Sequence, residues 1–316
     1  MAFYFVTRLG QIFCVIIAMS FIIYSLIGLM PGDPIDIMVQ SDPSLTSADA
    51  TRLKAIYGID RPLLERYSSW LLSASQGNFG FSRIHNRPVL EILVPRLINT
   101  CLLMGSSLVL ALIFAIPMGI YSAIRVHSPS DYTINLFALG GTSIPVFWLA
   151  LLLMVIFSVW LEWLPASAMH GQDADPLTKA QHLALPIIVL AMGTVGQLTR
   201  HMRSAMIETL KQDYIKTARA KGVRKNRIIF SHALRNAMIP VVTVLSLSFG
   251  SLFSGALITE TMFSYLGTGK LIFDSIMGND YNMALVSLLF ATGLVLLSNF
   301  IADLLYAWLD PRISYS

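Results

Sequence analysis

Charge is the scarcest property of this sequence. Asp, Glu, Lys and Arg together make up 13% of its 316 residues, whereas 55% of the residues are hydrophobic. Ordinary soluble domains carry about 25% charged residues. The deficit, with a mean hydropathy of +0.67, excludes a typical soluble domain and indicates a protein whose surface faces lipid.

Cysteine and histidine are also rare. Cys14 and Cys101, the only cysteines, lie in apolar stretches where a thiol behaves as a small hydrophobe, so they say nothing of a redox compartment. The six histidines form no His-Glu-x-x-His or other ligand-spaced pair, and no Gly-x-Ser-x-Gly occurs. We therefore expect no metal, no cofactor and no catalytic residue, which argues against an intramembrane enzyme.

Long charge-free runs are what the sequence does contain. A helix that crosses ~30 Å of hydrocarbon needs about 20 apolar residues and satisfies its own backbone hydrogen bonds there. The sequence therefore predicts an all-α membrane protein with six transmembrane helices. The six runs cover residues 9–32, 97–124, 132–161, 180–199, 236–259 and 281–302. The first is too long for the h-region of a signal peptide and ends in "MPGDP" without a cleavage pattern, so we expect it to remain as a helix.

The distribution of Lys and Arg predicts the orientation. Residues 200–235 hold ten of the 22 Lys and Arg residues against two acids, which places this segment and, with six helices, both termini in the cytoplasm. The segment 31–96 has seven basic and seven acidic residues and lies outside by parity. The predicted division is residues 1–30 for the N-terminus and first helix, 31–96 for an extracytoplasmic subdomain, and 97–316 for the membrane core.

Three runs are interrupted by proline, at Pro117, at Pro145 after "GGTSI", and at Pro186. Bent helices with free carbonyls suit a protein that lines a pathway, although ordinary proline tolerance in membrane helices is an equal alternative. In the fifth run Ser246, Gly250 and Ser254 recur every four residues, a spacing that favours close helix packing within the chain and, as an alternative, pathway lining or contact with a partner.

Glu260 and Lys270 enclose the loop after the fifth run. They are candidates to guard an outer mouth, and ordinary solvated loop charges are the simpler interpretation.

The basic segment has an internal order around Gly222. Upstream, Met206, Leu210, Tyr214 and Ala218 fall at intervals of four, which predicts an apolar stripe on a helix. Gly222 suits the left-handed position that ends a helix. Downstream, Ile228, Ile229 and Ala233 are expected on one side of a second helix.

A positive-inside signal with attraction to anionic lipid would explain the charge of this segment but not two helices hinged at a glycine. We favour a docking element for a cytoplasmic partner.

The stretch "DYIKTARAKGVRKNRIIFSHALRNAMIP" resembles the cytoplasmic coupling loop of ABC importer permeases, in the version of the dipeptide, oligopeptide and nickel permeases. The wider importer pattern is Glu-Ala-Ala, three residues, then Gly. Lys216 and Thr217 stand at its first two positions, and Ala218 and Gly222 match. "GLMPGDP", "YGIDRPLLERYSSWL", "WLPAS", "ITETMFSYLGTGKL" and "DPRISY" resemble the B-type subunit, as does "GNFGFS", where the family usually has Gly-Asp-Leu-Gly.

The resemblance implies a type I ABC importer permease fold with a coupling loop over residues 204–236. It implies as partners a C-type permease subunit, two cytoplasmic ATPases that bind ATP and Mg, and an extracytoplasmic substrate-binding protein, in a bacterial inner membrane. The implied substrates are di- or oligopeptides, with nickel chelates or glutathione as alternatives. The residues implied for ATPase coupling are Tyr214, Thr217, Ala218, Arg219, Ala220, Lys221, Gly222, Arg224, Arg227, His232 and Arg235.

Two features separate this interpretation from others. "YLGTGKLI" is no P-loop, because Ser264 and Leu271 replace the required Gly and Ser or Thr, so energy must come from another subunit. A secondary transporter or channel is the weaker alternative, since the six runs contain no Asp, Glu, Lys or Arg for coupling ions.

Overall fold

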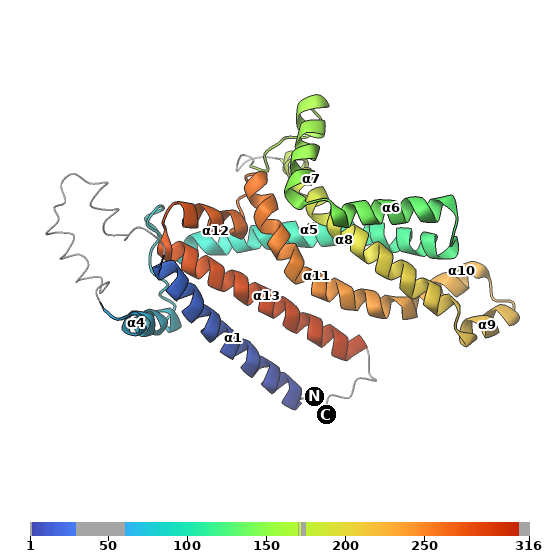
Figure 1. Ribbon diagram of the computed structural model, residues 1–316, viewed down its shortest axis with the longest axis horizontal. Helices are drawn as coiled ribbons and strands as arrows, with labels where there is room; N and C mark the ends of the chain where they lie inside the picture. Colours follow the sequence, from blue (N-terminus) through green and yellow to red (C-terminus); the bar gives the residue numbers. More distant parts are fainter. Residues whose placement is uncertain (1, 30–60, 170, 172–174, 310–316) are drawn as a thin grey trace. The chain divides into compact units, whose positions relative to one another are not determined.

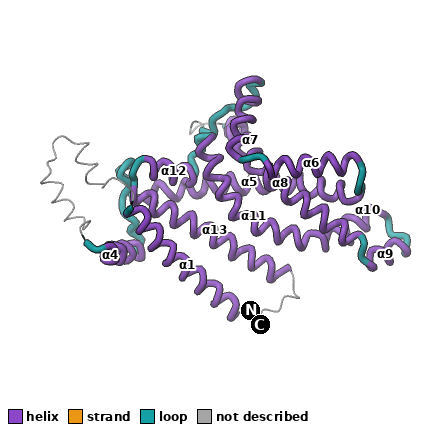
Figure 2. The backbone as a smooth tube through the Cα atoms, in the orientation of Figure 1, coloured by secondary structure: helices purple, strands orange, loops and turns teal. Residues whose placement is uncertain are grey.

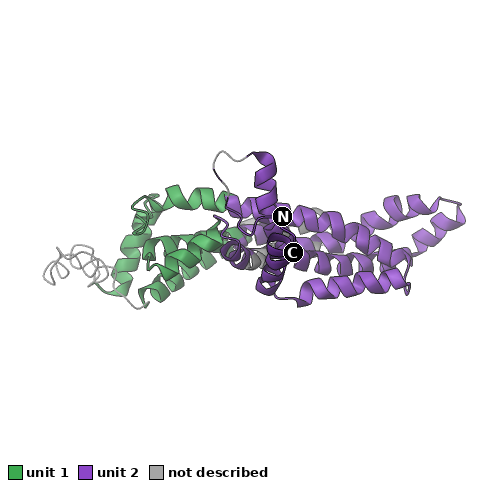
Figure 3. Ribbon diagram, turned by 90° about the horizontal axis from the view of Figure 1, so that it is seen from above, with its two compact units in different colours: residues 1–98, 267–294 green, residues 99–266, 295–316 purple. Residues whose placement is uncertain are grey.

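The computed structural model describes residues 2–29, 61–169, 171 and 175–309. Within this part of the chain every regular secondary-structure element is a helix, and the only β-type pairing is an isolated bridge between Phe81 and Pro88 (Figures 1 and 2). The predicted all-α class is confirmed. The chain divides into two compact units, residues 1–98 with 267–294 and residues 99–266 with 295–316 (Figure 3).

The apolar runs coincide with helices. Among the described residues, four helices are long and apolar enough to cross a membrane, and a pair bent by 105° makes a fifth if it is one span. The remaining predicted run lies in α11 (Leu234–Met262). The four helices are α1 (Ala2–Gly28), α5 (Val89–Ile124), α8 (Pro176–Leu210) and α13 (Tyr281–Leu309). The bent pair is α6 (Pro129–Ser143) with α7 (Val146–Met154) and the π-helical segment η1 (Val155–Trp160).

Only one of the three predicted proline interruptions breaks a helix. The bend lies at Ile144 and Pro145, where Ile144 is extended (φ −80°, ψ 125°) because the residue before a proline is disfavoured in the helical region. The helices α5 and α8 continue through Pro117 and Pro186, as the alternative of ordinary proline tolerance expects. Local adjustments in a membrane helix can satisfy the carbonyl that a proline leaves without a donor.

The first unit contains α1, α4 (Leu63–Ser75), α12 (Thr268–Met277) and the beginnings of α5 and α13. Ile23 and Ile27 of α1 pack with Ala284 and Leu285 of α13. The hydroxyls of Tyr67 on α4 and Ser20 on α1 are 2.8 Å apart. The helix α12 was not predicted from the sequence.

Asp280 organises the loops of the first unit. Its carboxylate is 1% exposed, and it accepts hydrogen bonds from the hydroxyl of Ser82, the backbone N–H of Ile84 (3.1 Å) and the backbone N–H of Met283 (3.3 Å). The bond from Met283 caps the start of α13, and the other two fix the loop that precedes α5. The sequence also has apolar residues at helical spacing, Ala50, Leu53 and Tyr57, which predict an amphipathic helix, and these positions lie outside the described residues.

In the second unit, glycines allow α6 and α8 to pack with their backbones in close contact. A Cβ atom on Gly196 would lie 2.3 Å from the carbonyl oxygen of Ala138, and one on Gly141 would lie 2.8 Å from that of Met192. Small residues permit such approach between membrane helices. The bent pair is thereby held against α8, from which the basic segment continues.

Candidate functional site

The basic segment, residues 200–235, leaves α8 at Lys211. Lys211 and Gln212 form a turn, with N–H groups bonded to the carbonyls of Glu208 and Thr209, and Gln212 is extended (ψ 151°) before α9 (Asp213–Ala220) starts. The predicted single stripe from Met206 to Ala218 is therefore wrong. An interval of four residues drifts by about 40° per step in a helix of 3.6 residues per turn, so four such positions cannot share one face. The turn divides them between α8 and α9.

The residue that anchors α9 is Ile215. Its side chain is completely buried, whereas the neighbouring Tyr214 is 43% exposed. The side-chain amide of Asn236 on α11 donates a hydrogen bond of 2.7 Å to the Tyr214 hydroxyl. Because of this bond and the burial of Ile215, α9 is fixed to the helices that it connects.

Gly222 ends α9 as predicted. Its φ of 75° lies in the left-handed region. The N–H of Val223 donates to the carbonyl of Ala218 (3.1 Å) and the N–H of Gly222 to that of Arg219 (2.9 Å), the two bonds of a Schellman motif. No atom lies within 4 Å of the position where a Cβ atom would be, so backbone conformation alone explains the glycine.

The downstream arm consists of α10 (Lys225–Arg227) and the π-helical segment η2 (Ile228–Ala233), which leads directly into α11. The predicted inward side is confirmed, since Ile228, Ile229 and Ala233 are at most 5% exposed. They share a hydrophobic core with Ile215, with Met202 and Met206 of α8, and with Ala115 of α5. Both arms are thus continuous with the core of the second unit, at the end of α8 and the beginning of α11 (Figure 1).

Most of the remaining side chains of the segment are exposed. All predicted coupling residues are exposed except Ala218 and His232, which are partly buried. Phe230, a large aromatic side chain that is 58% exposed among the basic residues, was not predicted from the sequence. A signal was present, because if Ile228 and Ile229 face inward, a helix turns Phe230 to the opposite side.

An ion pair stabilises α8 about two turns before the helix ends at Leu210. The guanidinium of Arg203 donates from Nε to Oδ1 of Asp131 (2.7 Å) and from Nη2 to Oδ2 (2.8 Å). Asp131 lies in the first turn of α6 and its side chain is 2% exposed. It also accepts hydrogen bonds from the hydroxyl of Ser122, the amide of Asn135 and the N–H of His127. This network joins α5, α6 and α8.

The other predicted residues lie elsewhere. Ser246, Gly250 and Ser254 are on α11, where their side chains are outside the described part of the chain. Lys270 on α12 forms an ion pair of 2.9 Å with Asp274.

Glu260 is completely buried, and its carboxylate accepts a hydrogen bond of 2.6 Å from Thr100. It therefore does not face an aqueous mouth in this conformation, and the guarding role stays a prediction.

The loop that follows Glu260 is ordered by buried contacts. The hydroxyl of Tyr265 donates to the carbonyl of Asn99 (3.1 Å), and the amide of Asn99 donates to the carbonyl of Leu266 (2.8 Å). Burial, with a smaller contribution from the charge of Glu260, raises the pKa of Tyr265 to about 12. The phenol therefore remains protonated and keeps its donor role at neutral pH.

The sequence of this chain matches a known family of membrane proteins. Residues 115–315 match the model of the binding-protein-dependent transport system inner membrane components. The chain belongs to this family. Family members are inner membrane components of transport systems, which agrees with the prediction of a transport subunit that is not an enzyme. The match includes the whole basic segment.

Relatives within the family resemble the chain over its full length. The oligopeptide transport system permease protein AppB of Bacillus subtilis is 38% identical, with 100% of both chains covered. The dipeptide transport system permease protein DppB of Escherichia coli K12 is 33% identical, with 98% of this chain and 97% of the relative covered. These matches confirm the predicted resemblance to the B-type peptide permeases.

A solved structure shares the fold. A chain of the MetNI methionine ABC transporter in an inward-facing conformation aligns with a TM-score of 0.58 at 17% identity, covering 70% of this chain and 97% of that chain. The helical core therefore shares its fold with a chain of an ABC transporter.

Proposed function

We propose that this chain is the B-type permease subunit of an ATP-driven, binding-protein-dependent importer of di- or oligopeptides. The observation that carries the proposal is the basic segment, which is exposed and cationic on one side and buried in the core of α5, α8 and α11 on the other. Such a segment can receive a movement from a cytoplasmic partner and transmit it to membrane helices. The names of the full-length relatives support the peptide substrate, with nickel chelates or glutathione as alternatives.

The proposed topology has six spans, with both termini and the basic segment in the cytoplasm of a bacterium and the chain in its inner membrane. The bent pair α6–α7 supplies the third span and α11 the fifth. Ten of the 22 Lys and Arg residues lie in residues 200–235, and this bias supports the orientation.

The proposed partners are a C-type permease subunit, two cytoplasmic ATPases and an extracytoplasmic binding protein. ATP and Mg bind to the ATPases, and this chain binds no cofactor. When the ATPases close on ATP, α9 and η2 move with them. Ile215, Ile228 and Ile229 are buried in one hydrophobic core with residues of α8 and α11. A movement of α9 and η2 therefore displaces α8 and α11 as well. The exposed cations select an acidic partner surface, since charge complementarity fixes partner and register.

The Schellman turn at Gly222 provides the test. In a Gly222→Val variant the left-handed conformation costs ~1–2 kcal/mol or more, because a β-branched residue is strained there, and no steric clash adds to it. We expect uptake and ATPase copurification to fall while the spans remain inserted. Gly222→Asn is the matched control, since asparagine tolerates this conformation, and it should retain most of the activity.

Normal uptake and normal ATPase retention in the Gly222→Val complex would reject the coupling role. The segment would then be only a positive-inside signal, for which the turn geometry is irrelevant.

A further inference from the structure

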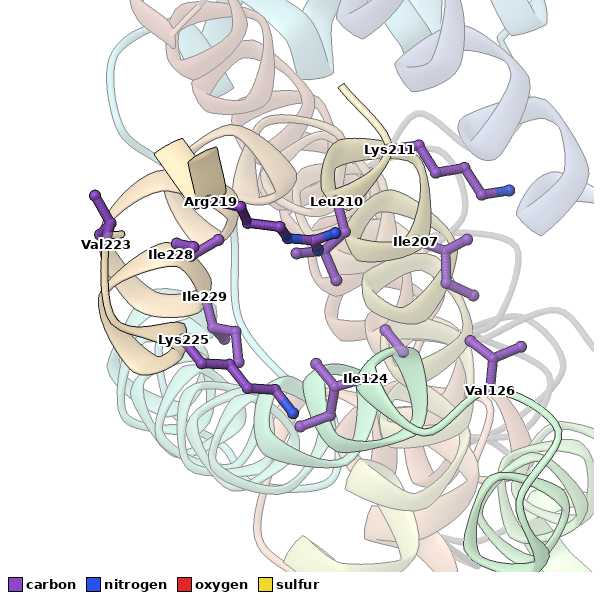
Figure 4. Close-up of a pocket in the computed structure, with 11 residues that line it drawn as sticks. Ile124, Val126, Ile207, Leu210, Lys211, Arg219, Val223, Lys225, Ile228 and Ile229 are labelled. Atoms are coloured by element: carbon purple, nitrogen blue, oxygen red, sulfur yellow. The ribbon is translucent and has the colours of Figure 1, made fainter. Parts of the chain in front are cut away.

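A groove lies where the bent pair α6–α7 meets α8, within the second unit. It has a volume of about 450 Å³, in the range of ligand-binding pockets. It is separate from the hollow behind the basic segment, where Arg219 and Lys225 lie at opposite edges (Figure 4). Its walls come from the end of α6, the bend, the start of α7 and one side of α8, and none of the described residues in them is acidic. The polar side chains in the walls are Thr142, Thr194, Gln197, Arg200 and His201.

The groove lies beside two of the charge-free runs. The bend is near the middle of the run 132–161, and just before it α6 packs against Met192 and Gly196 of α8, which belong to the run 180–199. Non-helical backbone at membrane depth is tolerated only where protein buries it or where it lines a water-filled cavity. Ile144 at the bend lines the groove. The groove therefore gives the exposed backbone of the bend a polar environment that acyl chains cannot give.

The start of α7 has unpaired backbone donors. Pro145 stands at the N-cap of α7 and offers no side-chain acceptor. In the described part of the chain, the first N–H of α7 with an acceptor is that of Leu149, which donates to the carbonyl of Pro145 (3.0 Å), so the N–H groups of residues 146–148 remain. Val146 lines the groove. The positive end of the α7 dipole is therefore next to the groove.

The hydroxyl of Thr194 on α8 is a further unpaired group. The residue is 7% exposed and lines the groove, and its hydroxyl makes no hydrogen bond with any other residue that the structure describes. A threonine in a helix often donates to a carbonyl of the preceding turn, as Thr142 does to Leu139 (3.0 Å). Because a buried hydroxyl without a partner is unfavourable, Thr194 favours a polar group that enters the groove.

The groups around the groove favour an anion over a cation. A helix N-terminus binds anions through its N–H groups, and the hydroxyl of Thr194 can donate to the same anion. Arg200 follows Thr194 by six positions, ~9 Å along the helix axis, and adds a positive charge to the walls. Gln197 lies between them and can pair with an amide. A carboxylate followed by peptide amides matches this order of groups.

We propose that the groove binds the C-terminal carboxylate of the transported peptide, with the N–H groups of residues 146–148 and the hydroxyl of Thr194 as donors and Arg200 as the nearby positive charge. The proposal rests on the proposed function, in which the bent pair is the third span of a peptide permease. The site acts after the binding protein has released the peptide. It makes the permease favour peptides with a free C-terminus over peptides with a C-terminal amide.

A membrane helix of the partner permease is the alternative occupant. Such a helix uses its own carbonyls for internal hydrogen bonds. If it packed across the groove, it would leave the N–H groups of residues 146–148 and the hydroxyl of Thr194 without acceptors. A carboxylate supplies acceptors for both.

The first test measures the charge preference of the groove in the purified complex of both permeases and the ATPases, with Cys14→Ser and Cys101→Ser as background. Thr194→Cys reacts with two methanethiosulfonate reagents, one with a sulfonate and one with a trimethylammonium group. Mass spectrometry of this chain gives each rate, which is divided by the rate of the same reagent with free 2-mercaptoethanol. The sulfonate should be favoured.

Arg200→Gln in the Thr194→Cys chain should lower this preference about fivefold, the factor for one charge at ~9 Å in water that acts with opposite sign on the two reagents. Thr199→Cys is the matched control. Thr199 lies on the same helix, is 1% exposed, has a buried hydroxyl without a partner among the described residues, and lies outside the groove. It should react with neither reagent.

The second test measures ATP-dependent uptake of a dipeptide and of its C-terminal amide, each at a concentration that saturates the binding protein. Thr194→Val keeps the shape of the side chain and removes the hydroxyl. It should lower the ratio of acid to amide uptake about tenfold, the factor for a hydrogen bond to a charged group. Thr194→Ser should restore the ratio, and Thr199→Val should leave it at the wild-type value.

An unreactive Thr194→Cys in the complex would assign the groove to the partner permease and overturn the proposal. Equal normalised rates for the two reagents, or a faster rate for the cationic one, would overturn it too, as would an unchanged ratio of acid to amide uptake in Thr194→Val. In these results peptide uptake by the wild-type complex still supports the permease function. A wild-type complex without ATP-dependent peptide uptake would instead reject that function, whatever the thiol reactions show.

Discussion

The ion pair between Arg203 and Asp131 should be the strongest single polar contribution to the stability of the second unit. Arg203→Ala removes two charge-assisted hydrogen bonds, of 2.7 and 2.8 Å, from a carboxylate that is 2% exposed. Removing one partner of a buried pair typically costs 3–5 kcal/mol. Asp131 keeps its donors from Ser122, Asn135 and His127, so we expect the lower end of the range, about 3 kcal/mol.

The assay is the free energy of unfolding in detergent micelles, measured by denaturant titration of tryptophan fluorescence. A double-mutant cycle with Asp131→Asn separates the pair from the rest of the network and should give a coupling energy of at least ~1.5 kcal/mol. The matched control is Arg87→Ala, which breaks an exposed pair with Glu91 whose side chains are 69% and 54% exposed. It should cost no more than ~0.5 kcal/mol. A coupling energy near zero for the Arg203 and Asp131 cycle would refute the reasoning.

Two further predictions concern the segment and the topology. Ile215→Ala removes the completely buried anchor of α9, so it should lower the free energy of unfolding by about 2–5 kcal/mol and reduce uptake. The control Thr217→Ala, on the exposed side of α9, should change the free energy of unfolding by less than ~0.5 kcal/mol. Equal stability of the two variants would contradict the anchoring role of Ile215. A Gln76→Cys variant should be labelled by a membrane-impermeant thiol reagent from outside the cell, and labelling only from the cytoplasm would exclude the six-span topology.

The helices of this fold could be predicted because their cause is local. A run without charge must satisfy its backbone internally in lipid, so the absence of Asp, Glu, Lys and Arg sufficed to place α5, α8 and α13. The turn at Gly222 is local too, since a left-handed residue between two amphipathic stretches has few alternatives to glycine. Its Schellman bonds follow from that conformation.

The parts that escaped prediction depend on distant partners. Asp131 and Arg203 both lie just beyond the ends of charge-free runs, yet they are 72 positions apart and only the packing of α6 on α8 brings them together. Asp280 is similar, because its partners Ser82 and Ile84 precede it by 198 and 196 positions. The turn at Lys211 and Gln212 escapes prediction for another reason, since a four-residue repeat resembles a helical face although it drifts around the helix.

Phe230 is the residue whose replacement should separate docking from folding. It is 58% exposed, so Phe230→Ala removes few internal contacts and should change the free energy of unfolding by less than ~0.5 kcal/mol. If Phe230 is a hot spot of the interface, its truncation costs ~2 kcal/mol or more, so ATPase affinity should fall about 30-fold. Phe81→Ala, which removes a 63% exposed phenylalanine outside the segment, is the matched control and should leave ATPase affinity unchanged. Wild-type ATPase affinity in Phe230→Ala would contradict this role of Phe230. The apolar anchor of the docking surface would then lie elsewhere, and the cations around Phe230 would contact the ATPase without a contribution from its ring.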